Sequence, residues 1–107
     1  MDLKEKISAL PSSPGVYIMR TASGGVLYVG KANNLKKRVS GYFRRSARHH
    51  ARIDSMVSQV GDIDFIPASS GAEALIYENG LIKELAPKYN VALRDDKSYP
   101  MLKLTVQ

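Results

Sequence analysis

The sequence predicts a small α/β (α+β) domain in which a mostly antiparallel central sheet is flanked by helices. Two β-rich segments, 16–19 and 26–29, are separated by Ser23-Gly24-Gly25, a pattern typical of a hairpin between antiparallel strands. Apolar residues at helical spacing mark the segments on either side of this hairpin. A chain of 107 residues is long enough for one core and too short for two, so we expect a single domain over 1–107.

The helices expected in the first half of the chain are marked by apolar spacing and by residues that begin or end helices. A short N-terminal helix would end at Pro11, which interrupts the pattern. Asn33 or Asn34 would cap a second helix, whose inner face is apolar and whose other faces are basic. A third helix is predicted over 47–60 and ends at Gly61.

The second half of the chain is predicted to add strands around the longest helix. Residues 62–66 alternate apolar and acidic side chains, which indicates a third strand with one buried face. The longest helix is predicted over 72–85, with Leu75 among its core residues, and Pro87 prevents its extension. Residues 101–106 are expected to form a last strand. Because the chain ends at or just after that strand, we interpret it as an N-terminal fragment of a longer protein.

The composition excludes several classes of protein and site. The chain has no cysteine, so disulfides and thiolate metal sites are excluded, and any metal must be bound by oxygen or by histidine nitrogen. No apolar run is long enough to span a bilayer, and the first residues lack the apolar stretch of a signal peptide. We therefore expect a cytoplasmic protein with no membrane partner.

Basic residues are concentrated in one part of the chain. Eight lie between positions 31 and 52 with no acid among them, whereas the other eight are outnumbered by ten acids. Such a segment is typical of a polyphosphate partner, because each phosphate neutralised by a cation releases counterions. A solvated helix face and an anionic protein partner are the alternatives. The residues expected to bind a nucleic-acid backbone are Lys36, Lys37, Arg44, Arg45, Arg48 and Arg52.

Glu78 is the most informative acidic residue, because its neighbours three, four or seven positions away on the predicted helix are apolar. Burying an unpaired charge is costly, so Glu78 needs a cation as its partner. That cation could be a metal ion or an arginine. Taken alone, a structural salt bridge is the more common role for an inward-facing carboxylate.

Two tyrosines, Tyr17 and Tyr28, lie on the two strands of the predicted hairpin, with Lys31 just beyond the second strand. Single tyrosines in strands usually serve packing. A tyrosine can also act as a general base when a nearby cation lowers its pKa from about 10, and Lys31 is placed to do so. Arg38 could bind a phosphate through two parallel hydrogen bonds, or it could simply belong to the cluster Lys36-Lys37-Arg38.

The order of these residues resembles the full signature of the GIY-YIG nucleases. The matching residues are Gly15-Val16-Tyr17, Tyr28-Val29-Gly30-Lys31, Arg38, Tyr42, Glu78 and Tyr89-Asn90. Valine replaces isoleucine in both tripeptides, which keeps a β-branched residue on each strand. Segment 94–100 is similar to the UvrC branch of that family in particular. The resemblance covers nearly the whole chain and implies the GIY-YIG endonuclease fold.

The resemblance also implies roles for individual residues. The implied catalytic residues are Tyr17, Tyr28, Lys31, Arg38, Tyr42 and Asn90. Glu78 would bind one divalent cation, Mg²⁺ or Mn²⁺, and Arg38 would position the scissile phosphate. One of the two strand tyrosines would act as general base with help from Lys31, and the choice between them stays open. A shortage of other acids at the matching positions favours one metal over two.

Other polar groups, and one glycine, are interpreted more simply. The acids outside the signature are more typical of strand and loop surfaces than of a metal site, and they are Asp62, Asp64, Asp95 and Asp96. His49 and His50 are adjacent and would point in different directions on a helix, so we do not expect a metal site there. Gly80 is expected to loosen the helix that carries Glu78.

The implied function is that of a metal-dependent DNA endonuclease domain in nucleotide excision repair. It would hydrolyse a phosphodiester on the 3′ side of a lesion in damaged double-stranded DNA, with the UvrA and UvrB proteins as partners in a bacterial cytoplasm. One alternative is a binding or docking module that retains the fold without cutting. The other is a UvrC-like stand-alone nuclease or a genome-mobility nuclease, which the native sequence beyond Gln107 would distinguish.

Overall fold

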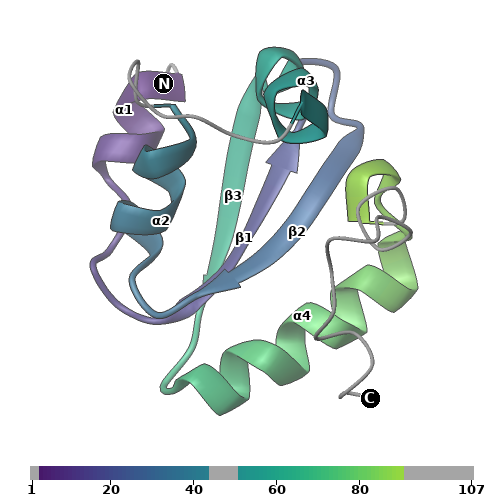
Figure 1. Cartoon of the computed structure of the whole chain (residues 1–107). Helices are drawn as coiled ribbons and strands as arrows, with labels where there is room; N and C mark the ends of the chain where they lie inside the picture. The colour runs from purple at the N-terminus through teal and green to yellow at the C-terminus, as the bar shows by residue number, and fades with distance from the viewer. Residues whose placement is uncertain (1–2, 44–50, 91–107) are drawn as a thin grey trace.

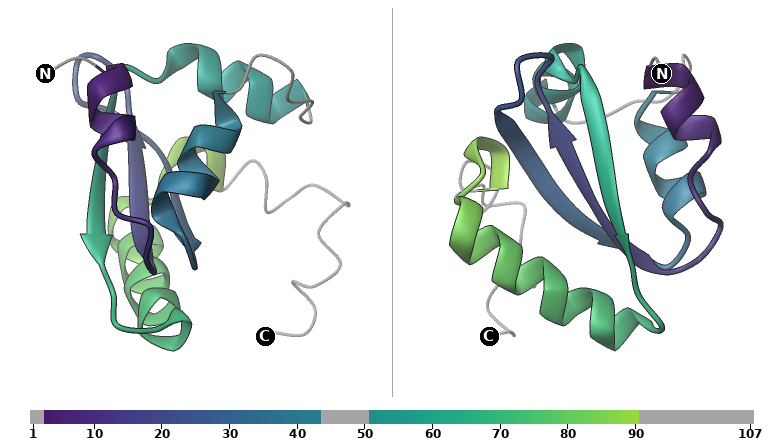
Figure 2. Two further views of the ribbon diagram at one scale, coloured as in Figure 1. Left: turned by 90° about the vertical axis from the view of Figure 1, so that its left-hand side faces the viewer. Right: turned by 180° about the vertical axis from the view of Figure 1, so that it is seen from behind.

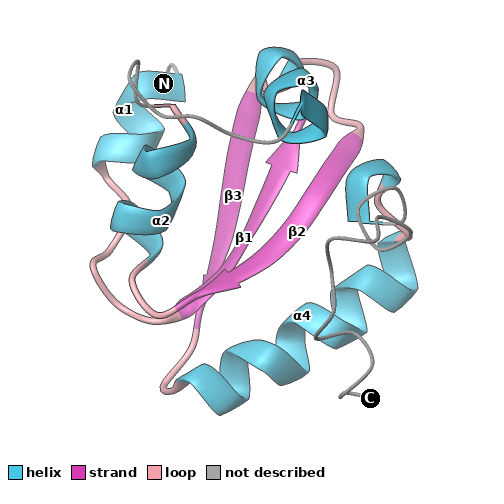
Figure 3. Ribbon diagram, viewed as in Figure 1, coloured by secondary structure: helices cyan, strands magenta, loops and turns pink. Residues whose placement is uncertain are grey.

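The computed structural model describes residues 3–43 and 51–90 (Figure 1). Its elements, in chain order, are α1 (Leu3–Ser8), β1 (Gly15–Arg20), β2 (Val26–Ala32), α2 (Leu35–Tyr42), α3 (Ala51–Gln59), β3 (Asp62–Pro67) and α4 (Gly71–Leu85). Figure 3 shows the strands running side by side in one sheet, with the helices around them. The α/β arrangement predicted from the sequence is therefore confirmed.

The described strands form a sheet of order β2-β1-β3, in which both pairs are antiparallel. The β1–β2 hairpin closes where the Thr21 N–H donates to the Gly25 carbonyl at 2.8 Å. Across the sheet, Tyr17 lies opposite Gly30 on one side and Phe65 on the other. β2 is thus an edge strand, and its outward backbone groups have no strand partner among the described residues.

Alternation along the strands divides the core into two layers. Tyr17 and Met19 of β1 lie on the face covered by α1, α2 and α3, in a cluster that includes the fully buried Met56 of α3. Val16 and Ile18 lie on the opposite face, in a cluster with residues of α4. Figure 2 shows from two sides that α1 and α2 pack together, while α4 lies apart from them beyond the sheet.

Helix α4 has specific capping interactions at both ends. The Ser70 hydroxyl accepts a hydrogen bond from the Glu73 N–H at 3.1 Å, and the Glu73 carboxylate accepts one from the Ser69 N–H at 2.7 Å. This exchange satisfies backbone donors that the first turn leaves free. At the other end, Ala86 adopts the left-handed conformation, with φ of 44°, and its N–H donates to the Ile82 carbonyl. The caps fix the length of the helix that carries Glu78.

The expected elements are confirmed with corrections. Of the two candidate caps, Asn34 caps α2 by accepting a hydrogen bond from the Lys37 N–H at 3.0 Å. Strand β2 continues to Ala32, so Lys31 lies within the strand rather than beyond it, opposite Val16 of β1. Leu75, expected in the core, is 43% exposed, because it is not among the α4 residues that pack against the sheet, which are Ala74, Leu81, Ile82 and Leu85.

Some expectations fall outside the described residues. The helix predicted over 47–60 is described only from residue 51, where α3 covers residues 51–59. The last strand, predicted over 101–106, lies wholly outside the described residues. Segment 94–100 lies outside as well. In the described parts of the chain, every helix is too short or too polar to cross a membrane.

Two glycines of the domain have opposite surroundings. At Gly30, an added methyl group would overlap the Tyr17 ring and hydroxyl, which lie directly over it. At Gly80, in α4, no other atom lies within 4 Å of where such a group would be. The first glycine permits a close approach between two strands. The second only adds conformational freedom to a helix.

We expect Gly80→Ala to raise the free energy of unfolding by about 0.5–1 kcal/mol, because alanine loses less backbone entropy in a helix and meets no obstruction. Gly30→Ala should lower it by about 1–3 kcal/mol, since the Tyr17 ring must move. Urea unfolding of the two variants beside the parent measures both values. A Gly80→Ala variant less stable than the parent would show that this position of α4 has a role other than loosening the helix.

Candidate active site at the edge of the sheet

Three tyrosine rings from two strands and one helix lie together on the α2 side of the sheet, with the Tyr17 ring next to each of the other two. Tyr17 of β1 is fully buried, and its hydroxyl lies 2.8 Å from the hydroxyl of Tyr42 in α2. The Tyr17 ring centre lies 5.9 Å from that of Tyr42 and 6.1 Å from that of Tyr28 in β2. Tilted contacts at these distances are favourable for aromatic rings. The structure therefore brings the three sequence-predicted tyrosines into one tyrosine cluster.

Arg38 adds a positive charge at the rim of the tyrosine cluster. It is exposed on α2, one turn before Tyr42, and its guanidinium carbon lies 5.6 Å from the Tyr42 ring centre. Its interaction with the Tyr17 hydroxyl is the main cause that raises the pKa of Arg38 above its usual range. The guanidinium therefore stays charged at any working pH, and its planar fork suits a phosphate.

Burial controls the acidity of Tyr17. Desolvation raises the pKa of Tyr17 well above 10.0, neighbouring Tyr42 and Tyr28 raise it further, and Arg38 opposes the rise. The expectation that Lys31 lowers the pKa of a strand tyrosine is therefore wrong for Tyr17, because the loss of water outweighs nearby positive charge. At neutral pH, Tyr17 is an uncharged phenol.

Glu78 reaches strand β2 from α4, on the other side of the sheet. Its Oε2 accepts a hydrogen bond of 3.1 Å from the backbone N–H of Lys31. Desolvation raises the pKa of Glu78, while that hydrogen bond and the charge of Lys31 oppose the rise. Within residues 3–43 and 53–90, no lysine or arginine forms an ion pair with this carboxylate. The salt bridge considered from the sequence is thus not made by the described residues.

Asn90 binds the same edge of β2 two residues earlier. Its Oδ1 accepts a hydrogen bond of 2.8 Å from the Val29 N–H, and its Nδ2 donates one of 2.9 Å to the Val29 carbonyl. Alternate residues of an antiparallel edge strand direct their backbone groups outward, so Val29 and Lys31 both face away from β1. The side chains of Asn90 and Glu78 therefore satisfy backbone groups that the open edge of the sheet leaves free.

Residues 28–31 of β2 contact the parts of the candidate site that lie on both faces of the sheet. Tyr28 belongs to the tyrosine cluster on the α2 side. The backbones of Val29 and Lys31 bind the carboxamide of Asn90 and the carboxylate from α4, and the Lys31 side chain is exposed. The structure places the Glu78 carboxylate against the β2 backbone, at the edge of the sheet.

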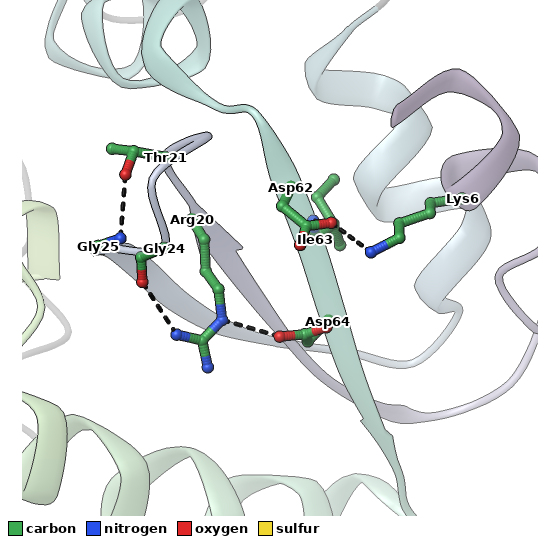
Figure 4. Close-up of polar contacts among 8 residues, drawn as sticks. All are labelled: Lys6, Arg20, Thr21, Gly24, Gly25, Asp62, Ile63 and Asp64. Carbon is green, nitrogen blue, oxygen red and sulfur yellow. Dashed lines mark hydrogen bonds and ion pairs between the residues drawn. The ribbon is translucent and has the colours of Figure 1, made fainter. Parts of the chain in front are cut away.

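Asp62 and Asp64 of β3 have partners of their own, on a strand separated from β2 by β1. Asp62 pairs with Lys6 of α1, and Asp64 accepts a hydrogen bond of 2.8 Å from the Arg20 Nε (Figure 4). The Arg20 guanidinium also donates to the Gly24 carbonyl at 3.3 Å. In the part of the chain that the structure describes, no three His, Cys, Asp or Glu residues form a group that could hold a metal ion. A metal at the β2 edge would therefore depend on a single protein carboxylate from these residues.

Two of the candidate nucleic-acid contacts, Lys36 and Lys37, are exposed on α2 next to Arg38. They extend the positive surface beside the tyrosine cluster. The side chains of the other four candidate contacts, Arg44, Arg45, Arg48 and Arg52, lie outside the described residues. The same holds for His49, His50, Asp95 and Asp96, for which no nucleic-acid contact was predicted.

Tyr89 is a residue of this site to which the sequence assigns no role. It is 7% exposed and packs in the core cluster on the α2 side. Its hydroxyl accepts a hydrogen bond of 2.7 Å from the Gln59 Nε2 and lies 3.1 Å from the Ser55 Oγ, both on α3. Its place next to Asn90 in the matched signature is the only signal in the sequence, because apolar spacing does not identify polar partners 30 and 34 residues away.

Comparison with known proteins gives relatives over nearly the full chain. The family model of the UvrC-like GIY-YIG domain matches residues 13–91. The UvrABC system protein C of Moorella thermoacetica is 52% identical over 107 residues, which is 100% of this chain. The corresponding protein of Chlorobaculum tepidum is 54% identical over 103 residues, or 96% of the chain. The chain spans 17% and 16% of the length of these two relatives.

Solved structures agree with these matches. The GIY-YIG N-terminal endonuclease domain of UvrC from Thermotoga maritima, bound to its catalytic divalent cation magnesium, matches with a TM-score of 0.71 and 32% identity. The match covers 81% of this chain and 93% of that domain. Point mutants of the same domain, in which an asparagine or a tyrosine is replaced, are also bound to the catalytic divalent cation. By the family model, the identities and the shared fold, the chain belongs to the UvrC-like GIY-YIG domain family.

Proposed function

We propose that this chain is a divalent-metal-dependent DNA endonuclease domain that cuts on the 3′ side of a lesion in nucleotide excision repair. It would act on damaged double-stranded DNA in the bacterial cytoplasm, with UvrA and UvrB as partners. The observation that carries this proposal is the environment of Glu78. Its carboxylate is partly buried, has a raised pKa and forms no ion pair with the described residues, and it contacts the strand that also carries Tyr28.

The surroundings of Glu78 fit a magnesium or manganese ion. One oxygen of the carboxylate accepts the Lys31 N–H, and the described residues give the other oxygen no hydrogen bond. Mg²⁺ is commonly bound by one or two carboxylates and keeps several waters, so a single carboxylate suffices. The Thermotoga maritima domain binds its cation even when an asparagine or a tyrosine is replaced, which favours a carboxylate as the ligand. When bound, the cation would stabilise negative charge on phosphoryl oxygens.

Arg38 would hold the scissile phosphate. Its guanidinium is exposed to an incoming strand, stays charged at every working pH and is oriented by its packing over the Tyr42 ring. Two parallel hydrogen bonds from this group would fix the phosphate and stabilise the charge that develops during in-line displacement. Lys31 lies on β2 and Asn90 binds its edge, and both would complete the active site.

Tyr28 is the better candidate for the general base. Tyr17 is fully buried, its hydroxyl contacts that of Tyr42, and desolvation raises its pKa, so it loses a proton with difficulty. Tyr28 is only partly buried and can therefore exchange a proton with water. Tyr17 would then act by holding the Tyr28 and Tyr42 rings and the guanidinium beside them.

The exposed lysines of α2, Lys36 and Lys37, would contact phosphates that flank the cleaved bond. Such contacts position a protein on DNA without reading sequence, and they weaken as the salt concentration rises. Recognition of a lesion would therefore come from the partner proteins.

In the central test, a lesion-bearing duplex is incubated with UvrA and UvrB, and Mn²⁺-dependent nicking is then measured with the native protein that carries this domain. Glu78→Gln and Arg38→Ala should each lower the rate of the 3′ cut by about 10²-fold or more, because each removes a group that stabilises developing charge. Glu84→Gln, an exposed acid on the same helix, is the matched control and should cut like the parent.

Circular dichroism and DNA-binding curves establish that the variants fold and bind. A parent protein that never cuts, or a Glu78→Gln variant that cuts normally, would refute the nuclease proposal and favour the module that binds without cutting.

Binding of Mn²⁺ should depend on pH through Glu78. Because desolvation raises the pKa of this carboxyl above its ordinary value of 4.5, protons compete with the cation into a less acidic range than usual. Affinity should rise with pH through the raised pKa and level off above it. Calorimetric titration of the parent with Mn²⁺ at a series of pH values measures this, and Glu78→Gln should show no comparable dependence.

Without metal, the raised pKa of Glu78 makes the folded state less stable as the pH rises, whereas metal affinity increases with pH. When the folded pKa of a carboxyl exceeds the unfolded one, the folded state binds more protons between the two values, so the free energy of unfolding falls as pH rises through that window. Glu78→Gln should therefore melt at a higher temperature than the parent near neutral pH without metal. The difference should vanish in acid. A lower melting temperature at neutral pH would show that the carboxylate has a stabilising partner.

The two strand tyrosines should differ in their effect on the rate. Tyr28→Phe should lower the single-turnover rate by about 10²-fold to 10⁴-fold and remove the rise of the rate with pH, because a general base acts only when it has lost its proton. Tyr17→Phe retains the ring and should preserve the shape of that profile. Single-turnover cleavage between pH 6 and pH 10 compares them. A profile altered by Tyr17→Phe and unchanged by Tyr28→Phe would reverse the assignment.

A further inference from the structure

Two neighbouring residues after α4 are held by different parts of the domain. Tyr89 packs its ring in the core, and its hydroxyl binds Ser55 and Gln59 of α3. Asn90, the next residue, binds the Val29 backbone through both atoms of its carboxamide. One peptide unit therefore connects α3 to the open edge of β2.

The Tyr89 hydroxyl accepts a hydrogen bond from the Gln59 carboxamide, which a second hydrogen bond within α3 also orients. The Gln59 Nε2 donates to the Ser55 carbonyl at 3.1 Å as well as to the Tyr89 hydroxyl at 2.7 Å. The Ser55 Oγ lies 3.1 Å from the same hydroxyl. Because Gln59 and Ser55 are one turn apart on α3, the helix places both side chains on the same face. These three side chains form what we call the α3 latch.

Asn90 depends on its backbone for its position. An asparagine side chain has only two rotatable bonds, so the paired hydrogen bonds to the Val29 N–H and carbonyl are possible only from a narrow range of backbone placements. Packing of the Tyr89 ring limits that range, and the hydroxyl contacts on α3 limit it further. Packing of the Tyr89 ring alone would fix the backbone at Asn90 less closely than ring packing and the hydroxyl contacts together.

We propose that the α3 latch, Ser55, Gln59 and Tyr89, is a positioning device that sets the Asn90 carboxamide against the edge of β2. Tyr89 is then a positioning residue, which acts through Asn90 and not on the substrate. The inference deepens the proposed nuclease function and rests on it as far as cutting is concerned. The structural part, that the latch holds Asn90 on Val29, is independent of any activity.

Hydrogen exchange at one backbone amide tests the structural part. The Val29 N–H donates to Asn90, whereas the Met19 N–H belongs to the central strand and reports on the whole fold. In Tyr89→Phe, which keeps the ring, the Val29 amide should exchange about tenfold faster or more, while Met19 keeps its protection. Asn90→Ala gives the reference for a fully released amide. Tyr77→Phe, on the exposed side of α4, removes a hydroxyl elsewhere and should change neither.

Gln59→Ala removes the donor and leaves Tyr89 intact, so it serves as a second variant if Tyr89→Phe folds poorly. Faster exchange at Val29 alone, in either variant, supports the latch. The proposal would be overturned if the Val29 amide exchanged at the parent rate in both Tyr89→Phe and Gln59→Ala but faster in Asn90→Ala. The contacts with α3 would then serve only the packing of the core. Equal acceleration at Val29 and Met19 would mean general destabilisation and would also overturn the proposal.

Cleavage kinetics test the functional part. Tyr89→Phe and Gln59→Ala should each lower kcat about tenfold with little change in KM. Added to Asn90→Ala, neither substitution should lower kcat below that of Asn90→Ala alone. Residues that act through one another are non-additive in this way, whereas two independent structural losses add. Additive losses would overturn the functional part. A parent that does not cut would refute the proposed nuclease function, while the exchange result at Val29 would still decide the structural inference.

Discussion

The outer edge of strand β2 imposes the constraint on which this domain depends. A strand at the edge of a sheet leaves alternate N–H and carbonyl groups without partners, and such groups are costly when buried and prone to pair with other chains when exposed. Here the Asn90 carboxamide takes both groups of Val29, and the Glu78 carboxylate takes the N–H of Lys31. Two of the residues proposed for the active site, Glu78 and Asn90, therefore also complete the edge of the sheet.

Each of these contacts joins parts of the chain that are distant in sequence. Glu78 is 47 residues from Lys31, and Asn90 is 61 residues from Val29. Only a domain in which α4 is docked on β1 and β2 can form them, and the caps of α4 set the point along the strand that Glu78 reaches. On the other face, the tyrosine cluster needs α2 to be in place before Tyr17 finds a partner for its hydroxyl. The site is thus a product of the completed fold rather than of any one element.

This explains how much could be predicted from the sequence. The hairpin, a cap at Asn33 or Asn34 and a strand over 62–66 follow from local patterns. The signature named the tyrosines that the fold brings together. Spacing marked Glu78 as facing inward, but the identity of its partner depends on where a strand 47 residues away happens to pass. The acidity of Tyr17 was misjudged for a similar reason. The charge nearby is visible in the sequence, whereas complete burial beneath Tyr42 is visible only in the fold.

The middle of α4 departs from what stability alone would favour. Its ends are well capped by Ser70, Glu73 and the turn at Ala86, yet its centre carries a carboxylate whose charge is disfavoured by desolvation, followed two residues later by a glycine with open space around it. Both features lower helix stability. Proteins commonly retain such costs where a site needs them. A cation at Glu78 would offset the larger of the two costs, so metal binding would be coupled to the stability of the helix that presents its ligand.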